Sequence, residues 1–193
     1  MPLNNQILPF NKQVKTVLII LAVVTLVEVL NLFSQRWFNQ FGLLPRDINH
    51  LIGIFTSPFL HGSFSHYLSN ILPLAVFSLL MLQYGTKRFA LVSLWIIVAS
   101  GLLVWLFGRT AYHVGASGLI YGYFGFLILA GFMAKKLKLI LISLLVGFVY
   151  GGLVYGVLPS DRFFVSWEYH LFGFITGLIA ARYWVRKRTT ASH

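Results

Sequence analysis

Three short polar segments stand out in a chain that is otherwise strongly apolar. They are residues 61–70 (HGSFSHYLSN), 115–122 (GASGLIYG) and 168–177 (EYHLFGFITG). Serine, histidine and asparagine are residue types that supply the nucleophile, the general base and the oxyanion donors of hydrolases. Together these side chains could hydrolyse an acyl bond.

The spacing within the segments predicts which side chains share a helix face. Residues four apart lie on one face of a helix, so His66 pairs with Asn70 and Ser117 pairs with Tyr121. The third segment gives a small-residue stripe after His170. Such stripes allow helices to approach closely, and four glycines are predicted to pack the serine helix against the histidine helix: Gly118, Gly122, Gly173 and Gly177.

Close packing would bring Ser117 within hydrogen-bond reach of His170. A serine hydroxyl becomes a good nucleophile when a neutral imidazole accepts its proton. Glu168 lies two residues before His170 and points to another helix face, so a triad with a carboxylate is not evident. A Ser–His dyad is therefore predicted, with Tyr121 packing against the imidazole.

A tetrahedral oxyanion also needs hydrogen-bond donors. We expect His66 and Asn70 to supply side-chain donors and the backbone N–H of Ser117 to supply another. Gly115 permits a backbone geometry that a Cβ would hinder. Each residue also has a structural interpretation, because serine is a common helix N-cap and asparagine often bonds between membrane helices.

The composition indicates a membrane protein. Of 193 residues, 58% are hydrophobic and 10% are charged, whereas a soluble domain carries about 25% charged residues. Six apolar stretches are predicted to span the bilayer as an all-α bundle within one domain, residues 1–193. They are Val14–Phe33, His66–Tyr84, Phe89–Phe107, Ser117–Met133, Leu137–Val157 and Tyr169–Val185, with a long first loop at 34–65.

In a soluble protein the net charge of +11 would suggest nucleic-acid binding. Here the basic residues flank apolar runs, which is typical of membrane topology signals. Membrane lipid is the expected partner, and no nucleic acid is expected. The richer side should be cytoplasmic, which places both termini inside. Eleven basic residues share that side: Lys12, Lys15, Lys87, Arg88, Lys135, Lys136, Lys138, Arg182, Arg186, Lys187 and Arg188. Four lie on the other: Arg36, Arg46, Arg109 and Arg162.

Other intramembrane protease chemistries lack their residues. The chain has no cysteine and no His-Glu-x-x-His run, so no metal site or other cofactor is predicted. Asp47 and Asp161 fall in loops, where they cannot form a membrane-embedded pair of aspartates. Glu28 lies near the outer end of the first span, where we expect it to bond to the first loop without a catalytic role.

The three segments resemble the motifs of the rhomboid family of intramembrane serine proteases. Residues 115–118 (GASG) look like its Gly-x-Ser-Gly motif, and residues 61–70 and 170–177 look like its second-helix and sixth-helix patterns. The resemblance implies a Ser117–His170 dyad, oxyanion side chains at His66 and Asn70, and a histidine-stacking Tyr121. The chain departs from many rhomboids by lacking a Trp-Arg pair in the first loop, where residues 52 and 53 are Ile and Gly.

The resemblance further implies a minimal six-helix bacterial form in the inner membrane. The expected substrates are transmembrane or membrane-anchored proteins, cleaved near the outer membrane face. Two alternatives stay open. One is a non-proteolytic binder of transmembrane helices, like inactive relatives in the family, and the other is a rhombosortase-like role within the enzyme class. The sequence makes no prediction of oligomeric state.

Overall fold

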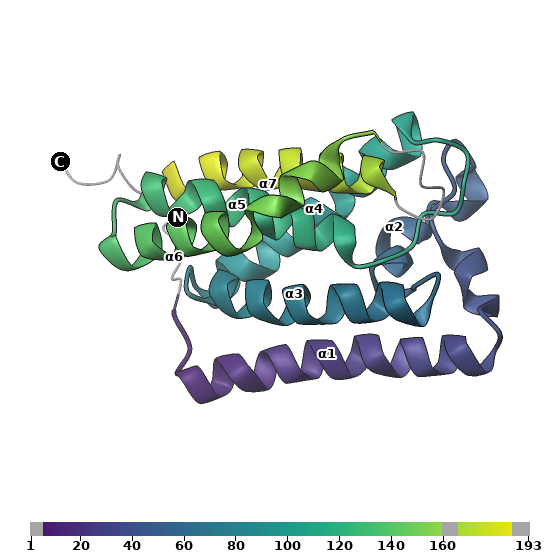
Figure 1. Cartoon of the computed structure of the whole chain (residues 1–193), viewed down its shortest axis with the longest axis horizontal. Coiled ribbons are helices and arrows are strands. Elements are labelled where there is room, and N and C mark those ends of the chain that lie inside the picture. Colours follow the sequence, from purple (N-terminus) through teal and green to yellow (C-terminus); the bar gives the residue numbers. More distant parts are fainter. Residues whose placement is uncertain (1–5, 160–165, 187–193) are drawn as a thin grey trace.

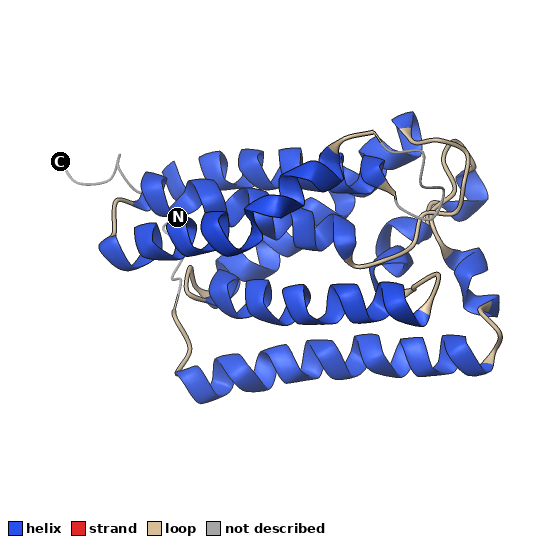
Figure 2. Ribbon diagram, in the orientation of Figure 1, coloured by secondary structure: helices blue, strands red, loops and turns tan. Residues whose placement is uncertain are grey.

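The computed structural model describes residues 6–159 and 166–186, and within these ranges the chain is helical with no β-strand (Figure 2). The α-helices are α1 (Phe10–Phe33), α2 (Gly53–Thr56), α3 (Phe64–Leu82), α4 (Thr86–Phe107), α5 (Ser117–Ala134), α6 (Leu137–Tyr150) and α7 (Trp167–Arg186). The 3-10 helices are η1 (Trp37–Phe41), η2 (Ile48–His50), η3 (Ser57–Phe59) and η4 (Gly151–Val157).

Five helical stretches of the described chain are long and apolar enough to cross a membrane. They are Phe10–Phe33, Phe64–Leu82, Thr86–Phe107, Ser117–Ala134 and Leu137–Val157. Each coincides with a predicted span, with small shifts at the ends, because long apolar runs need a lipid or protein environment. Helix α7 forms where the sixth span is predicted but is not among the five, since Glu168, Arg182 and Arg186 reduce its apolar character.

The long helices lie along the long axis of the molecule, with α5 in the middle of the packing (Figure 1). Helix α5 contacts α3, α4, α6 and α7, and 67% of its apolar stretch is buried. Helix α1 lies at the edge and packs mainly on α3. The stretch that begins with α6 is only 11% buried. The core is therefore centred on α5, the helix that begins at Ser117.

The two ends of the bundle differ in character. The start of α1 and the end of α7 lie at one end, together with the short connections from α3 to α4 and from α5 to α6 (Figure 1). The short helices of residues 34–63 lie at the other end. Helices α3, α5 and α7 all begin at this second end, so His66, Ser117 and His170 come from the first turns of three neighbouring helices.

The first loop, residues 34–63, is folded against the connection between α4 and α5. Leu43 and His113 pair through an isolated antiparallel bridge. Arg46 donates one hydrogen bond to the Gly108 carbonyl and another to the Thr110 hydroxyl, each at 2.7 Å. Because loops need partners for their backbone groups, these contacts give the loop a defined structure without a Trp-Arg pair.

Candidate functional site

A cavity of about 870 Å³, lined by both polar and apolar residues, lies among the first turns of α3, α5 and α7. Ser117, His170, His66, Asn70 and Tyr121 all line it. The Ser117 and His170 residues are 8% and 9% exposed, so both are largely withdrawn from solvent. The structure thus brings the five predicted catalytic and oxyanion residues to one cavity.

Glycines bring α5 and α7 into backbone contact below the cavity. A Cβ on Gly173 would overlap the carbonyl oxygen of Gly118, and a Cβ on Gly177 would overlap that of Gly122. Backbone oxygens cannot move aside as flexible side chains can. The backbones of α5 and α7 therefore lie in close contact at these glycines.

The imidazole of His170 is held by two contacts. The Tyr121 ring stacks on it with centroids 4.0 Å apart and planes 5° from parallel. His170 Nδ1 lies 3.0 Å from the carbonyl oxygen of Gly156 in η4. A carbonyl only accepts hydrogen bonds, so Nδ1 carries the proton and donates. The other nitrogen, Nε2, is then left with a lone pair, as a general base requires.

The backbone before Ser117 turns at Gly115, whose φ is +123°. That conformation favours glycine, and the space beside Gly115 is also too small for a side chain. A Cβ on Gly115 would lie 2.7 Å from His66 Cε1, 2.8 Å from His66 Nε2 and 3.7 Å from Ser117 Oγ. Gly115 therefore places the serine hydroxyl and the His66 imidazole around the same small space.

His66 and Asn70 occupy the first two turns of α3. The Ser63 hydroxyl accepts from His66 N at 3.1 Å and caps this helix. One N–H of the Asn70 amide donates to the His66 carbonyl at 2.7 Å. An amide nitrogen carries two hydrogens, so a second N–H remains to serve as a donor in the cavity.

Within the described chain, neither Ser117 nor a carboxylate forms a hydrogen bond with the His170 imidazole. The hydrogen bonds of the described residues do not include one between Ser117 Oγ and His170 Nε2. Such bonds are often long in ligand-free enzymes and tighten when substrate binds. Glu168 instead accepts from Arg109 N at 3.3 Å and approaches Arg109 Nε at 3.5 Å. Ser117 and His170 therefore share a cavity, and the nearby carboxylate of Glu168 is engaged elsewhere.

Two other histidines outside the spans have structural partners. His113 contacts the Ser166 hydroxyl and the Arg109 carbonyl, and burial lowers its pKa. His50 Nδ1 lies 2.9 Å from Asp47 Oδ2, and the backbone N–H of Asn49 together with this contact lowers the pKa of Asp47. These residues hold loops together.

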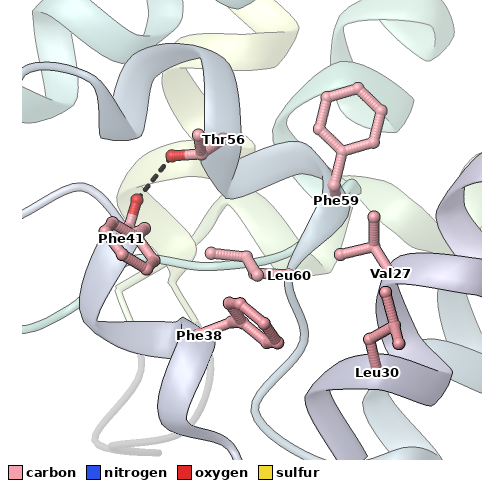
Figure 3. Close-up of a pocket in the computed structure, with 7 residues that line it drawn as sticks. All are labelled: Val27, Leu30, Phe38, Phe41, Thr56, Phe59 and Leu60. Atoms are coloured by element: carbon pink, nitrogen blue, oxygen red, sulfur yellow. Dashed lines mark hydrogen bonds between the residues drawn. The ribbon is translucent and has the colours of Figure 1, made fainter.

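A second, apolar pocket of about 270 Å³ lies between α1 and the first loop (Figure 3). Its lining residues are Val27, Leu30, Phe38, Phe41, Thr56, Phe59 and Leu60. The Thr56 hydroxyl, the one polar side-chain group among them, donates to the Phe41 carbonyl. The lining of this pocket includes no histidine or carboxylate, and its one hydroxyl is engaged, so it resembles an apolar contact surface more than a reaction site.

Metal ligands do not gather anywhere in residues 6–159 and 166–186: no group of three or more His, Cys, Asp or Glu side chains is placed to hold an ion. The functional group that sequence reasoning missed is the carbonyl of Gly156. It contributes backbone alone, and any residue type would carry that oxygen, so the sequence holds no signal for it.

Comparison with known proteins identifies relatives over most of the chain. A family model described as the Rhomboid domain matches residues 49–187. The chain is 36% identical over 174 residues to "Uncharacterized protein Rv1337" of Mycobacterium tuberculosis, covering 86% of this chain and 72% of that protein. It is 32% identical over 174 residues to "Uncharacterized protein ML1171" of Mycobacterium leprae, covering 86% and 69%.

Proposed function

The chain belongs to the rhomboid family, and from this premise we propose that it is an intramembrane serine endopeptidase. Its substrates are transmembrane or membrane-anchored proteins. Cleavage takes place near the outer membrane face, within the cavity at the first turns of α3, α5 and α7. The observation that carries the proposal is the orientation of His170, whose Nδ1 is engaged by Gly156 while Nε2 is left to accept a proton.

In the proposed reaction, Ser117 Oγ attacks the carbonyl carbon of the scissile peptide bond. His170 Nε2 takes the hydroxyl proton as the Oγ–C bond forms. The tetrahedral intermediate collapses when the C–N bond breaks, and His170 returns the proton to the leaving amine. Water then attacks the carbonyl carbon of the acyl-enzyme while His170 Nε2 takes a proton from it. The bond from this carbon to Ser117 Oγ breaks, His170 returns the proton to Oγ, and the new carboxyl terminus is released.

The negative charge of the intermediate is stabilised by donors on two sides. The Asn70 amide and the His66 imidazole face the cavity from α3. The backbone N–H of Ser117 lies at the start of α5, where helix N–H groups have no partner within the helix. Gly115 keeps this space open, because a side chain there would fill the gap between His66 and Ser117.

We place the whole chain, residues 1–193, in the membrane as a single domain with α7 as a sixth span. Both termini lie in the cytoplasm, because the basic residues divide 11 to 4 in favour of that side. The membrane is a bacterial inner membrane. A regular helix hides its carbonyls from attack, so the substrate must unwind locally to enter the cavity.

The alternative is a non-proteolytic binder of transmembrane helices. The observation in its favour is that Ser117 and His170 make no hydrogen bond to each other in this conformation. A binder would keep the cavity and the helix packing but would show no nucleophile. Reactivity of Ser117 therefore separates the two functions.

The test is cleavage of a model transmembrane substrate by purified protein in detergent, with fluorophosphonate labelling of the serine. Ser117→Ala or His170→Ala should lower the rate by roughly 10⁴-fold or more. Ser117→Ala should keep the thermal unfolding midpoint of the wild type, whereas His170→Ala should lower it, because the buried ring and its stack on Tyr121 are lost. Ser100→Ala is the matched control, since Ser100 is buried in α4 and bonds only to the Ile96 carbonyl of its own helix. Cleavage by Ser117→Ala would refute the assignment, and folded protein that is never labelled would establish the binder.

A further inference from the structure

The outer half of α1 buries a carboxylate that the proposed reaction does not use. Glu28 is 2% exposed in a helix whose surface is otherwise mostly open. A carboxylate at such a position is costly unless it has partners. Glu28 Oε1 accepts a hydrogen bond from Arg36 Nη1 at 2.8 Å. Glu28 Oε2 is buried and has no hydrogen-bond partner among the described residues.

The same cluster holds the segment that leads into α3. The carbonyl oxygen of His61 accepts from Arg36 Nη1 at 3.1 Å, from Asn39 Nδ2 at 3.2 Å and from Asn31 Nδ2 at 3.4 Å. Three donors on one carbonyl fix the backbone of His61 to the end of α1 and to η1. The start of α3 is therefore anchored through His61.

The His61 side chain faces the carboxylate on one side and the site on the other. Its Nδ1 lies 3.8 Å from Glu28 Oε2, and in the described chain neither ring nitrogen has a hydrogen-bond partner. The His61 ring is fully buried and packs edge-on against the His66 ring, with centroids 5.2 Å apart. Burial, followed by the nearby charges of His66 and Arg36, lowers the pKa of His61 to about 3, so its ring is neutral.

We propose that Glu28 acts through His61 as a positioning residue for His66, the imidazole assigned to the oxyanion. Glu28 Oε2 faces His61 Nδ1 without a partner of its own, and as a hydrogen-bond acceptor it selects the His61 tautomer that carries its proton on Nδ1. An inward movement of roughly 1 Å would bring the two atoms, now 3.8 Å apart, to hydrogen-bond distance. A fixed His61 ring gives His66 a fixed surface to pack on, which keeps its N–H aimed at the reacting carbonyl. The role rests on the proposed protease function.

Glu28→Gln tests the role directly. The amide keeps the size of the side chain and can still accept from Arg36, but it presents an N–H to His61 where the ring needs an acceptor. We expect kcat to fall by about 10-fold to 100-fold, as for other residues that orient a catalytic group, while KM stays within about twofold. Loss of α1 packing alone would not produce this split.

His61→Phe is the second variant, because phenylalanine keeps the ring packing and removes both nitrogens. It should lower kcat by a similar factor, and the double variant should be no worse than either single one, since both break one interaction. If the Glu28→Gln protein does not fold, the kcat of the His61→Phe protein alone tests the positioning role.

The control is Gln13→Leu, which removes another buried polar side chain from the opposite end of α1. It should lower the thermal unfolding midpoint and leave kcat intact. Wild-type kcat in His61→Phe, losses that add in the double variant, or an equal loss of kcat in Gln13→Leu would each overturn the positioning role. These outcomes are read against cleavage that depends on Ser117, so they are separate from a failure of the protease function itself.

Discussion

Replacing Gly173 with alanine should damage the reaction without touching a reacting group. Gly173 lies one turn beyond His170 on α7, against the backbone of α5 that carries Ser117. The new Cβ would overlap the carbonyl oxygen of Gly118, which is fixed within a helix and cannot turn away. The two helices must therefore move apart.

The size of the effect follows from this movement. Restoring an ordinary non-bonded separation requires a shift of roughly 1 Å. A misplacement of about 1 Å between catalytic groups can lower a rate by about 100-fold. Overpacking a helix contact costs about 1–3 kcal/mol of stability. We therefore expect a folded, moderately destabilised Gly173→Ala protein whose kcat is about a hundredth of the wild-type value.

The assay compares Gly173→Ala with Gly147→Ala in the same detergent. Gly147 lies in α6, and a Cβ there meets nothing within 4 Å. Its replacement should leave kcat and fluorophosphonate labelling unchanged, because alanine fits and favours a helix by about 1 kcal/mol. Thermal unfolding of both proteins separates the effect on rate from the effect on folding.

Wild-type kcat in Gly173→Ala would refute the reasoning, because the contact between α5 and α7 would then not set the distance between Ser117 and His170. Equal losses of kcat in Gly173→Ala and Gly147→Ala would also refute it, since the effect would not depend on the backbone contact.

Two further predictions concern single side chains. Tyr121→Phe should retain kcat within about twofold because the ring stack on His170 remains. Tyr121→Ala should lower kcat by about fivefold, which is the equivalent of an aromatic contact worth roughly 1 kcal/mol; equal rates for the two variants would show that the stack does not matter. The lowered pKa of His61, about 3 in the folded protein against 6.5 when unfolded, means that the unfolded chain binds the proton first as pH falls. Acidification from pH 7 to 5 should therefore cost roughly 2 kcal/mol of stability through His61, and His61→Asn should show a smaller drop in thermal midpoint over that range.

The long apolar helices could be predicted because apolar runs favour helices that are shielded from water. The central helix begins at Ser117 as expected, since the residues before it contain Gly115 with a positive φ. Helix α1 begins at Phe10 and not at Val14, because polar residues continue the helix before the apolar run starts. The predicted span 137–157 changes after Tyr150 from α-helix to the 3-10 helix η4, a change of hydrogen-bond pattern that hydropathy does not register.

The predicted site residues lie at one cavity, whereas the backbone groups around them could not be predicted. Spacing identified the stack of Tyr121 on His170 and the glycine contacts between α5 and α7, because both depend on helix periodicity. The expected bond from Glu28 to the first loop is confirmed by Arg36. The contact of the Gly156 carbonyl with His170 and the hydrogen bonds to the His61 carbonyl could not be predicted. Both depend on how η4 and the first loop fold back onto the helices.

The contact between His170 and the Gly156 carbonyl links the strength of the base to the position of a neighbouring helix. A carboxylate partner would be lost by one substitution and would stop accepting in the same way once protonated. A main-chain carbonyl oxygen is present in every residue type and is not protonated in this pH range. This oxygen moves away from His170 when η4 moves. Helix η4 continues directly from α6, and the stretch that they form is the least buried of the five apolar stretches. Displacement of α6 would carry the oxygen away from Nδ1 and release the imidazole to rotate. In the proposed reaction, the position of η4 would therefore control the orientation of the base.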